Sequence, residues 1–290
     1  MEITPPGPEN TVVGTLPAYF AYLQSGGYST YTPRQFLSDV NSFGLFVREK
    51  KLKELTIHDI HQWISKLKTD GLKLRQQPYT AKTINRKLSA INNYFLWLVT
   101  HGALADNPAA GLHVPKVISP LPDILFESEC KQLLTTASAD PRSYLLVLLL
   151  LETGIKKEEL FALRLTHFDF SNRYAPELWV KHTSKKVKKD RKLKLPQETE
   201  PVFRDYVSVS HITDVLFPYT PRFVESLITD IARRSGVQKK VTASILRDTY
   251  AVRCLKRGED IELVLKKLGL SESTWEDARI KYLKLASQAI

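Results

Sequence analysis

The stretch Thr153-Gly-Ile-Lys-Lys-Glu-Glu-Leu-Phe-Ala-Leu-Arg164 is typical of a helix end, a tight glycine turn and a second short helix that begins with lysine. The apolar run 144–151 precedes it, and this run is too short to span a bilayer. We therefore expect a buried helix that ends at Gly154. Farther along the chain, Leu246-Arg-Asp-Thr-Tyr-Ala251 places an arginine inside an amphipathic helix.

Helical periodicity also dominates the first third of the chain. Its clearest segment is 81–100, where apolar residues recur on one face, Thr80 can cap the start and Gly102 lies just past the end. Two or three further helices are expected before it, around residues 16–24, 32–49 and 57–69. Lys82, Arg86 and Lys87 lie mostly off the apolar face of the 81–100 helix, which makes them candidate DNA contacts.

Four X-Pro steps interrupt the helical pattern between residues 107 and 122. They predict a linker at 113–122 between a helical domain, 11–112, and a second domain, 123–290. The alternative is a surface loop inside a single domain. Residues 1–10 are rich in proline and are expected to form a mobile arm.

The second domain changes character once along its length. Residues 177–182 and 191–196 alternate between apolar and polar side chains, which predicts a small antiparallel sheet of two or three strands. Helices are expected around this sheet at 127–137, at 141–153, at 199–207, at 221–234, at 241–256, at 261–268 and at 275–286. The predicted fold class is therefore mainly α with a small antiparallel β-sheet.

The composition favours a polyanionic partner. The 290 residues carry a net charge of +11 and a pI near 9.5, which favours nucleic acid first and an anionic membrane surface second. Cys130 and Cys254 form no CxxC pair and suggest reduced thiols in a cytosolic protein, with no metal and no cofactor. The N-terminus lacks the features of a signal peptide, so we expect a cytoplasmic, nucleoid-associated protein with no membrane attachment.

Four features could act on phosphate. Lys156 stands at a helix start, where cations are locally unfavourable, and Arg247 could grip phosphate oxygens in bidentate fashion. Neighbouring cations would favour the phenolate of Tyr282. The fourth feature is a cationic hairpin tip, in which the candidate DNA contacts are Lys185, Lys186, Lys188, Lys189 and Arg191. Alternatively, these charges are solvated on turns, Arg247 forms a structural pair with Asp248, and Tyr282 is a packed tyrosine.

In their order along the chain, which is Lys156, the cationic hairpin, Arg247 and Tyr282, the four features together resemble the active site of the tyrosine recombinases, the phage-integrase family. The resemblance implies a catalytic-type domain at 123–290, and residues 83–98 are similar to the last helix of that family's SAM-like core-binding domain. It assigns catalytic parts to Lys156, Lys186 (with Lys185 as a near alternative), Arg247 and Tyr282. The tyrosine of that family attacks a DNA phosphate and forms a 3′-phosphotyrosyl link, without metal or nucleotide.

The chain departs from this pattern at several positions. Lys156 replaces an arginine and keeps its charge without its planar fork. Ser244 and Leu270 stand where the pattern has histidines, and Asp248 follows Arg247 where a histidine is frequent. The usual place of the nucleophile is Arg279, three residues before Tyr282.

From the resemblance we predict a DNA-binding protein of the integrase family that is involved in DNA integration or site-specific recombination. From the departures we predict that its catalysis is impaired or lost. One alternative is an active recombinase with a variant site. Another is a non-enzymatic regulator or accessory factor, and a remoter one is a protein-interaction module whose charge is incidental. The expected partner is double-stranded DNA, with possible self-association on it.

Overall fold

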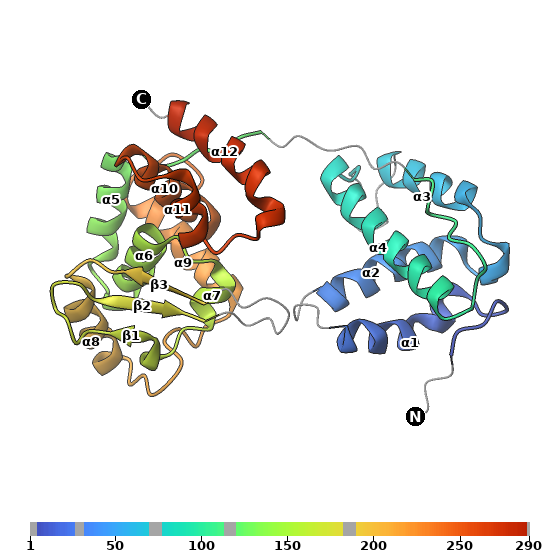
Figure 1. Ribbon diagram of the computed structural model, residues 1–290, viewed down its shortest axis with the longest axis horizontal. Helices are drawn as coiled ribbons and strands as arrows, with labels where there is room; N and C mark the ends of the chain where they lie inside the picture. The colour runs from blue at the N-terminus through green and yellow to red at the C-terminus, as the bar shows by residue number, and fades with distance from the viewer. Residues whose placement is uncertain (1–4, 27–31, 70–76, 113–119, 182–189, 289–290) are drawn as a thin grey trace. The chain divides into compact units, whose positions relative to one another are not determined.

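The computed structural model describes residues 5–26, 32–69, 77–112, 120–181 and 190–288 (Figure 1). By its internal contacts the chain divides into two compact units, residues 1–119 and 120–290. This division falls within the stretch predicted as a linker, of which residues 113–119 lie outside the described part. Each unit buries an apolar core of its own.

The first unit is a helical bundle in which α2 packs against the other three α-helices. Its elements are α1 (Val12–Ser25), α2 (Thr32–Val47), the 3₁₀ turn η1 (Leu52–Glu54), α3 (Ile57–Thr69) and α4 (Ala81–Thr100). As predicted, the Thr80 side chain caps α4 by accepting from the backbone N–H of Thr83, and Gly102 follows with a φ of 73°. Tyr19, Tyr94 and Trp97 pack edge to face or tilted in the core, an arrangement that adds to the apolar burial.

The last residues of the predicted mobile arm, 8–10, contact the rest of the first unit. The backbone N–H groups of Leu52 and Lys53 donate to the carbonyls of Asn10 and Pro8, and Glu9 forms ion pairs with Lys51 and Lys53. Residues 8–10 are therefore attached to the 51–53 segment. This pairing joins segments far apart in the sequence, which local composition does not reveal. Residues 1–4 lie outside the described part.

The second unit is built around one buried helix. Residues 145–151 of α6 (Pro141–Thr153) are all buried, and the helix begins with Asp140 as cap and Pro141 in its first turn. Gly154 ends it in the left-handed conformation, with a φ of 59°. Around α6 lie α5 (Glu127–Ala137), α7 (Lys157–Phe161), η2 (Leu165–His167), α8 (Thr199–Val209), α9 (Pro221–Arg234), α10 (Ala243–Lys256), α11 (Ile261–Lys267), η3 (Glu272–Thr274) and α12 (Trp275–Gln288).

The sheet has three antiparallel strands in the order β1-β2-β3, and it confirms the predicted fold class. The strands are β1 (Phe168–Asp169), β2 (Glu177–Val180) and β3 (Arg191–Lys194). In the register of β2 and β3, Leu178 faces Leu193 on the buried side and Trp179 faces Lys192 on the exposed side. This alternation follows from the two-residue period that the sequence shows.

The packing of α10 positions the residues of the candidate site. One side of α10 packs against α6 and another against α12, and α11 touches β3 (Figure 1). α10 therefore contacts both α6 and α12, and α11 links it to β3. Among the described residues, none of the helices has both the length and the apolar character needed to cross a bilayer.

Candidate functional site

Arg247 is the centre of the candidate site. This arginine lies on α10 and is 8% exposed, and its guanidinium donates to two main-chain carbonyls. One is the carbonyl of Gly154, at the end of α6, and the other is that of Leu268, at 2.6 Å. Arg247 thus ties α10 to the glycine turn and to the segment that follows α11.

The glycine turn carries Lys156 to the start of α7. The backbone N–H of Lys156 donates to the Glu159 carboxylate at 2.7 Å, so an acid three residues into the helix satisfies a free donor at its start. Lys157, the second lysine of the turn, forms an ion pair with Glu225 of α9 at 2.7 Å. Since Gly154 is bound to Arg247, the structure brings the Lys156 turn beside Arg247.

Arg191 of β3 reaches the same place from the sheet. Its guanidinium binds the Glu159 carboxylate through two hydrogen bonds of 2.8 Å, and its Nε donates to the Lys267 carbonyl at 2.6 Å. Burial by itself would raise the pKa of Glu159, but the hydrogen bonds and charge of Arg191 hold this pKa below its ordinary value. Arg191, a candidate DNA contact in the sequence, is instead committed to a buried ion pair within the protein.

Tyr282 lies on α12 and is 4% exposed. Its hydroxyl donates to Oδ1 of Asp248 at 3.0 Å, and the neighbouring Lys281 ammonium binds both oxygens of that carboxylate, at 2.7 and 2.8 Å. Burial raises the pKa of Tyr282, the Asp248 charge raises it further, and the nearby Arg247 opposes both. The structure therefore places the tyrosine next to Arg247, and it holds the hydroxyl in its neutral form.

Ser244 and Leu270, where the resemblance leads us to expect histidines, carry no imidazole. Ser244 is exposed at the start of α10. Leu270 is half-buried and packs on the small apolar cluster that contains Tyr250, Leu268 and Tyr282. Neither residue has a ring nitrogen that could donate a proton. Lys185, Lys186, Lys188 and Lys189 lie outside the described residues.

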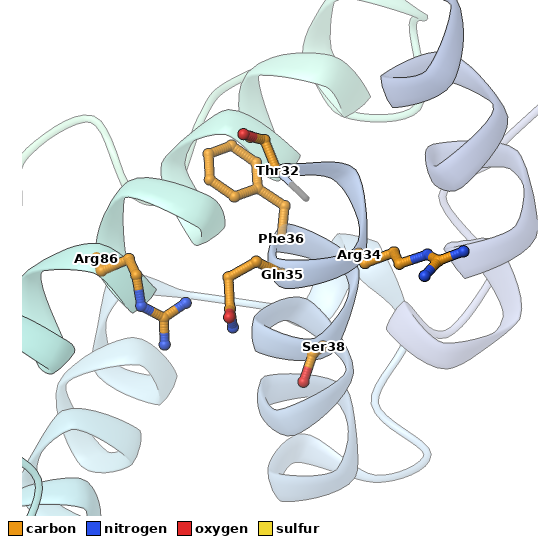
Figure 2. A pocket seen from close by; sticks show the side chains of 6 residues that line it. All are labelled: Thr32, Arg34, Gln35, Phe36, Ser38 and Arg86. Carbon is orange, nitrogen blue, oxygen red and sulfur yellow. The ribbon is translucent and has the colours of Figure 1, made fainter. Parts of the chain in front are cut away.

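In the first unit, the three predicted cations of α4 have different environments. Lys82 is exposed. Lys87 is buried and binds Asp39 of α2 at 2.9 Å, and Arg86 binds the same carboxylate from a more exposed position. Arg86 also lines a pocket of about 470 Å³ between α2 and α4, and Figure 2 shows its guanidinium on the side of α4 that faces α2. The residues lining this pocket are Thr32, Arg34, Gln35, Phe36, Ser38 and Arg86.

Sequence reasoning missed Glu159 and Lys281 as members of the site. It considered Asp248 as a structural partner of Arg247 and as a departure from the family pattern, but not as a partner of Tyr282. A local signal existed for Glu159, because an acid three residues after a helix cap often accepts from the cap. No local signal pairs Asp248 with Lys281 and Tyr282, which are 33 and 34 residues away in the sequence.

Comparisons with known proteins identify a family for each of the two units. Residues 16–102 match the family described as "Phage integrase, N-terminal SAM-like domain". Residues 124–276, more than half of the chain, match the "Phage integrase family". The predicted SAM-like and catalytic-type domains are thereby confirmed.

Curated relatives match over most of their length. The chain is 29% identical over 251 residues to a "Tyrosine recombinase" of Pseudothermotoga lettingae, with 84% of each chain covered. It is 27% identical over 283 residues to "Tyrosine recombinase XerC" of Anoxybacillus flavithermus, with 88% of each covered.

Solved structures extend the similarity to three dimensions. The crystal structure of XerA recombinase is 25% identical, with a TM-score of 0.51 and coverage of 96% of this chain and 98% of that one. A lambda integrase dimer bound to a COC′ core site is 16% identical and shares the fold, with a TM-score of 0.71 over 93% of this chain and 77% of that one. This chain therefore belongs to the phage integrase family, the family of the tyrosine recombinases.

Proposed function

We propose that this protein binds duplex DNA at recombination sites and takes part in DNA integration or site-specific recombination, with strand cleavage that is slow or lost. Family membership supports the DNA part, since relatives of the same fold include a lambda integrase on a core site and a XerH recombinase on its difH substrate. The net charge of +11 supports it independently, because a polyanion attracts such a surface. The protein would act in the cytoplasm, on the nucleoid.

The observation that carries the impaired-cleavage part is the bonding of Arg247. An arginine grips a phosphate best when its planar fork faces the anion. Here both terminal nitrogens of Arg247 donate to main-chain carbonyls of the protein. With Lys156 in the other arginine position and Leu270 in a histidine position, fewer donors remain for the charge that develops on a phosphate. The loss of one such donor typically lowers a rate by about 10²–10³.

One observation favours the alternative of an active enzyme with a variant site. Tyr282 lies close enough to Arg247 for the arginine to lower its pKa against the effects of burial and Asp248. In that reading Lys156, a hairpin lysine (Lys186 or Lys185), Arg247 and Tyr282 would suffice for cleavage. Covalent trapping of protein on DNA separates the two readings.

Salt dependence tests the DNA-binding part. The binding constant for supercoiled or linear duplex from the native genomic neighbourhood of the gene is measured between about 50 and 200 mM salt. The proposal predicts that log affinity falls linearly with log salt, by about 0.9 for each phosphate contacted. A flat response would reject DNA binding and would leave the protein-interaction reading. Self-association on DNA, part of the same proposal, is measured by sedimentation of the complex.

A further inference from the structure

Asp248 binds two consecutive residues of the C-terminal helix. Its carboxylate is 5% exposed and lies on α10, where that helix packs against α12. It accepts from the Lys281 ammonium at 2.7 and 2.8 Å and from the Tyr282 hydroxyl at 3.0 Å. A buried carboxylate requires such donors, because burial of an unpaired charge is costly.

Lys281 binds Asp248 from the more exposed side of the pair. Its side chain is 34% exposed, and its ammonium also lies 5.0 Å from the centre of the Tyr282 ring. It therefore offsets the Asp248 charge and contacts the ring whose hydroxyl Asp248 binds. Arg247, the residue before Asp248, is the other cation near the phenol oxygen.

We propose that Asp248 and Lys281 are positioning residues for Tyr282: they fix its hydroxyl beside Arg247 as a neutral phenol, and Tyr282 reaches a phosphate only after this hydroxyl leaves Asp248. The inference rests on the proposed function, in which Tyr282 is the candidate nucleophile. A phenolate in the present position would stand at hydrogen-bond distance from a carboxylate, and two anions so close repel each other. The carboxylate also repels a phosphate that approaches Arg247.

The two positioning residues act on Tyr282 with opposite electrostatic sign. In Asp248→Asn the side chain keeps its size and an acceptor oxygen but loses its charge. The pKa of Tyr282, which burial and the Asp248 charge raise, then falls towards its ordinary value. In Lys281→Gln the negative charge of Asp248 stays and its compensating cation is removed, so the phenolate becomes less favourable. A general loosening of α12 would instead expose Tyr282 in both variants.

Nitration by tetranitromethane measures this difference without DNA, because the reagent attacks the phenolate. The rate at each tyrosine is followed by mass spectrometry of peptides from wild type, Asp248→Asn and Lys281→Gln over a series of pH values. Two tyrosines of the same protein serve as controls. Tyr174 is 76% exposed and reports the reagent, whereas Tyr250 is 7% exposed in the same apolar cluster as Tyr282 and reports loosening.

We expect slow nitration of Tyr282 in wild type and about tenfold faster nitration in Asp248→Asn for each unit by which its pKa falls. Lys281→Gln should show no increase, and Tyr250 should react equally slowly in all three proteins. An unchanged Tyr282 profile in Asp248→Asn, a parallel rise at Tyr250, or an equal rise in Lys281→Gln would overturn the inference.

Measuring the salt dependence of DNA binding for the same three proteins distinguishes failure of the positioning role from failure of the proposed function. Steep salt dependence together with an unchanged nitration profile would overturn the positioning role alone. The expected nitration profile together with a flat salt response would overturn the proposed function, and the contact between Asp248 and Tyr282 would stand as a property of the fold.

Discussion

Arg191 and Glu159 form a two-point ion pair that joins the sheet to the glycine turn. Both hydrogen bonds measure 2.8 Å, and the two side chains are 10% and 9% exposed. The same arginine binds the Lys267 carbonyl. Gly269 has a φ of 61°, and a Cβ there would also lie 2.6 Å from the Arg191 guanidinium, so this position favours glycine. The ion pair thus fixes the turn that carries Lys156 and the segment that carries Leu270.

Breaking this pair on one side should destabilise the second unit. Glu159→Gln leaves the Arg191 charge buried without a counterion, and loss of one partner of a buried pair costs about 3–5 kcal/mol. Urea unfolding at pH 7 measures the difference. The control is Glu200→Gln, which removes the partner of Arg204 in an ion pair whose arginine is 68% exposed, and such surface pairs contribute about 0–1 kcal/mol. Equal costs for the two variants would contradict the structural role of Glu159.

The same pair predicts a pH dependence with a definite sign. The pKa of Glu159 in the folded protein lies below its ordinary value of 4.5, so its contribution to stability is present above pH 4.5. It is lost as the pH falls through the lowered pKa and the carboxylate takes up a proton. The stability difference between wild type and Glu159→Gln should therefore be constant near neutrality and shrink in acid. A difference that grows in acid would contradict this assignment.

Gly154 should resist substitution more strongly than another glycine with a similar backbone. A Cβ at Gly154 would lie 2.3 Å from Cδ1 of Tyr250, whereas a Cβ at Gly236 would meet no atom within 4 Å. Both have positive φ, 59° and 77°, and this conformation costs a non-glycine residue about 1–2 kcal/mol. Gly236→Ala should show that cost alone, and Gly154→Ala a clearly larger loss of stability in thermal unfolding. Equal losses would show that Tyr250 moves aside freely.

Two lysines of α4 should respond differently to removal. Lys82→Ala should keep the fold, weaken DNA binding and reduce the salt slope by about 1, because an exposed lysine contributes by neutralising a phosphate. Lys87→Ala should lower the unfolding temperature instead, because Asp39 loses its buried partner. Circular dichroism and binding titrations on both variants separate the effects. A Lys87→Ala protein of normal stability and weakened DNA binding would reverse this assignment.

The hairpin lysines should contribute to affinity for every DNA sequence alike. Replacing Lys185, Lys186, Lys188 and Lys189 with alanine removes four positive charges from one segment. Phosphate contacts carry no base information, so specific and unrelated duplexes should lose affinity in parallel. Fluorescence anisotropy on both duplexes at fixed salt measures this loss. Unchanged affinity would reject the hairpin as a DNA contact.

The fold was largely predictable because its signals are local. The cap and apolar face of α4, the glycine end of α6 and the alternation in β2 each lie within a few residues of sequence. The approach of Arg247 and Tyr282 was also expected, through the order of motifs. The partners of the charged groups were not predictable. Arg191 with Glu159, Lys87 with Asp39 and Tyr282 with Asp248 are separated by 32, 48 and 34 residues, so each pair depends on tertiary packing.

Covalent trapping on DNA tests the central claim most directly. Wild type and Tyr282→Phe are incubated with supercoiled DNA that carries the native genomic neighbourhood of the gene, quenched in detergent and examined for protein-linked DNA. DNA binding of both proteins is measured in parallel at low and high salt. The account predicts salt-sensitive binding by both, and little or no linked DNA in wild type above the background seen with Tyr282→Phe. Linked DNA that accumulates in wild type and is absent from Tyr282→Phe would contradict impaired cleavage and would establish an active recombinase with a variant site.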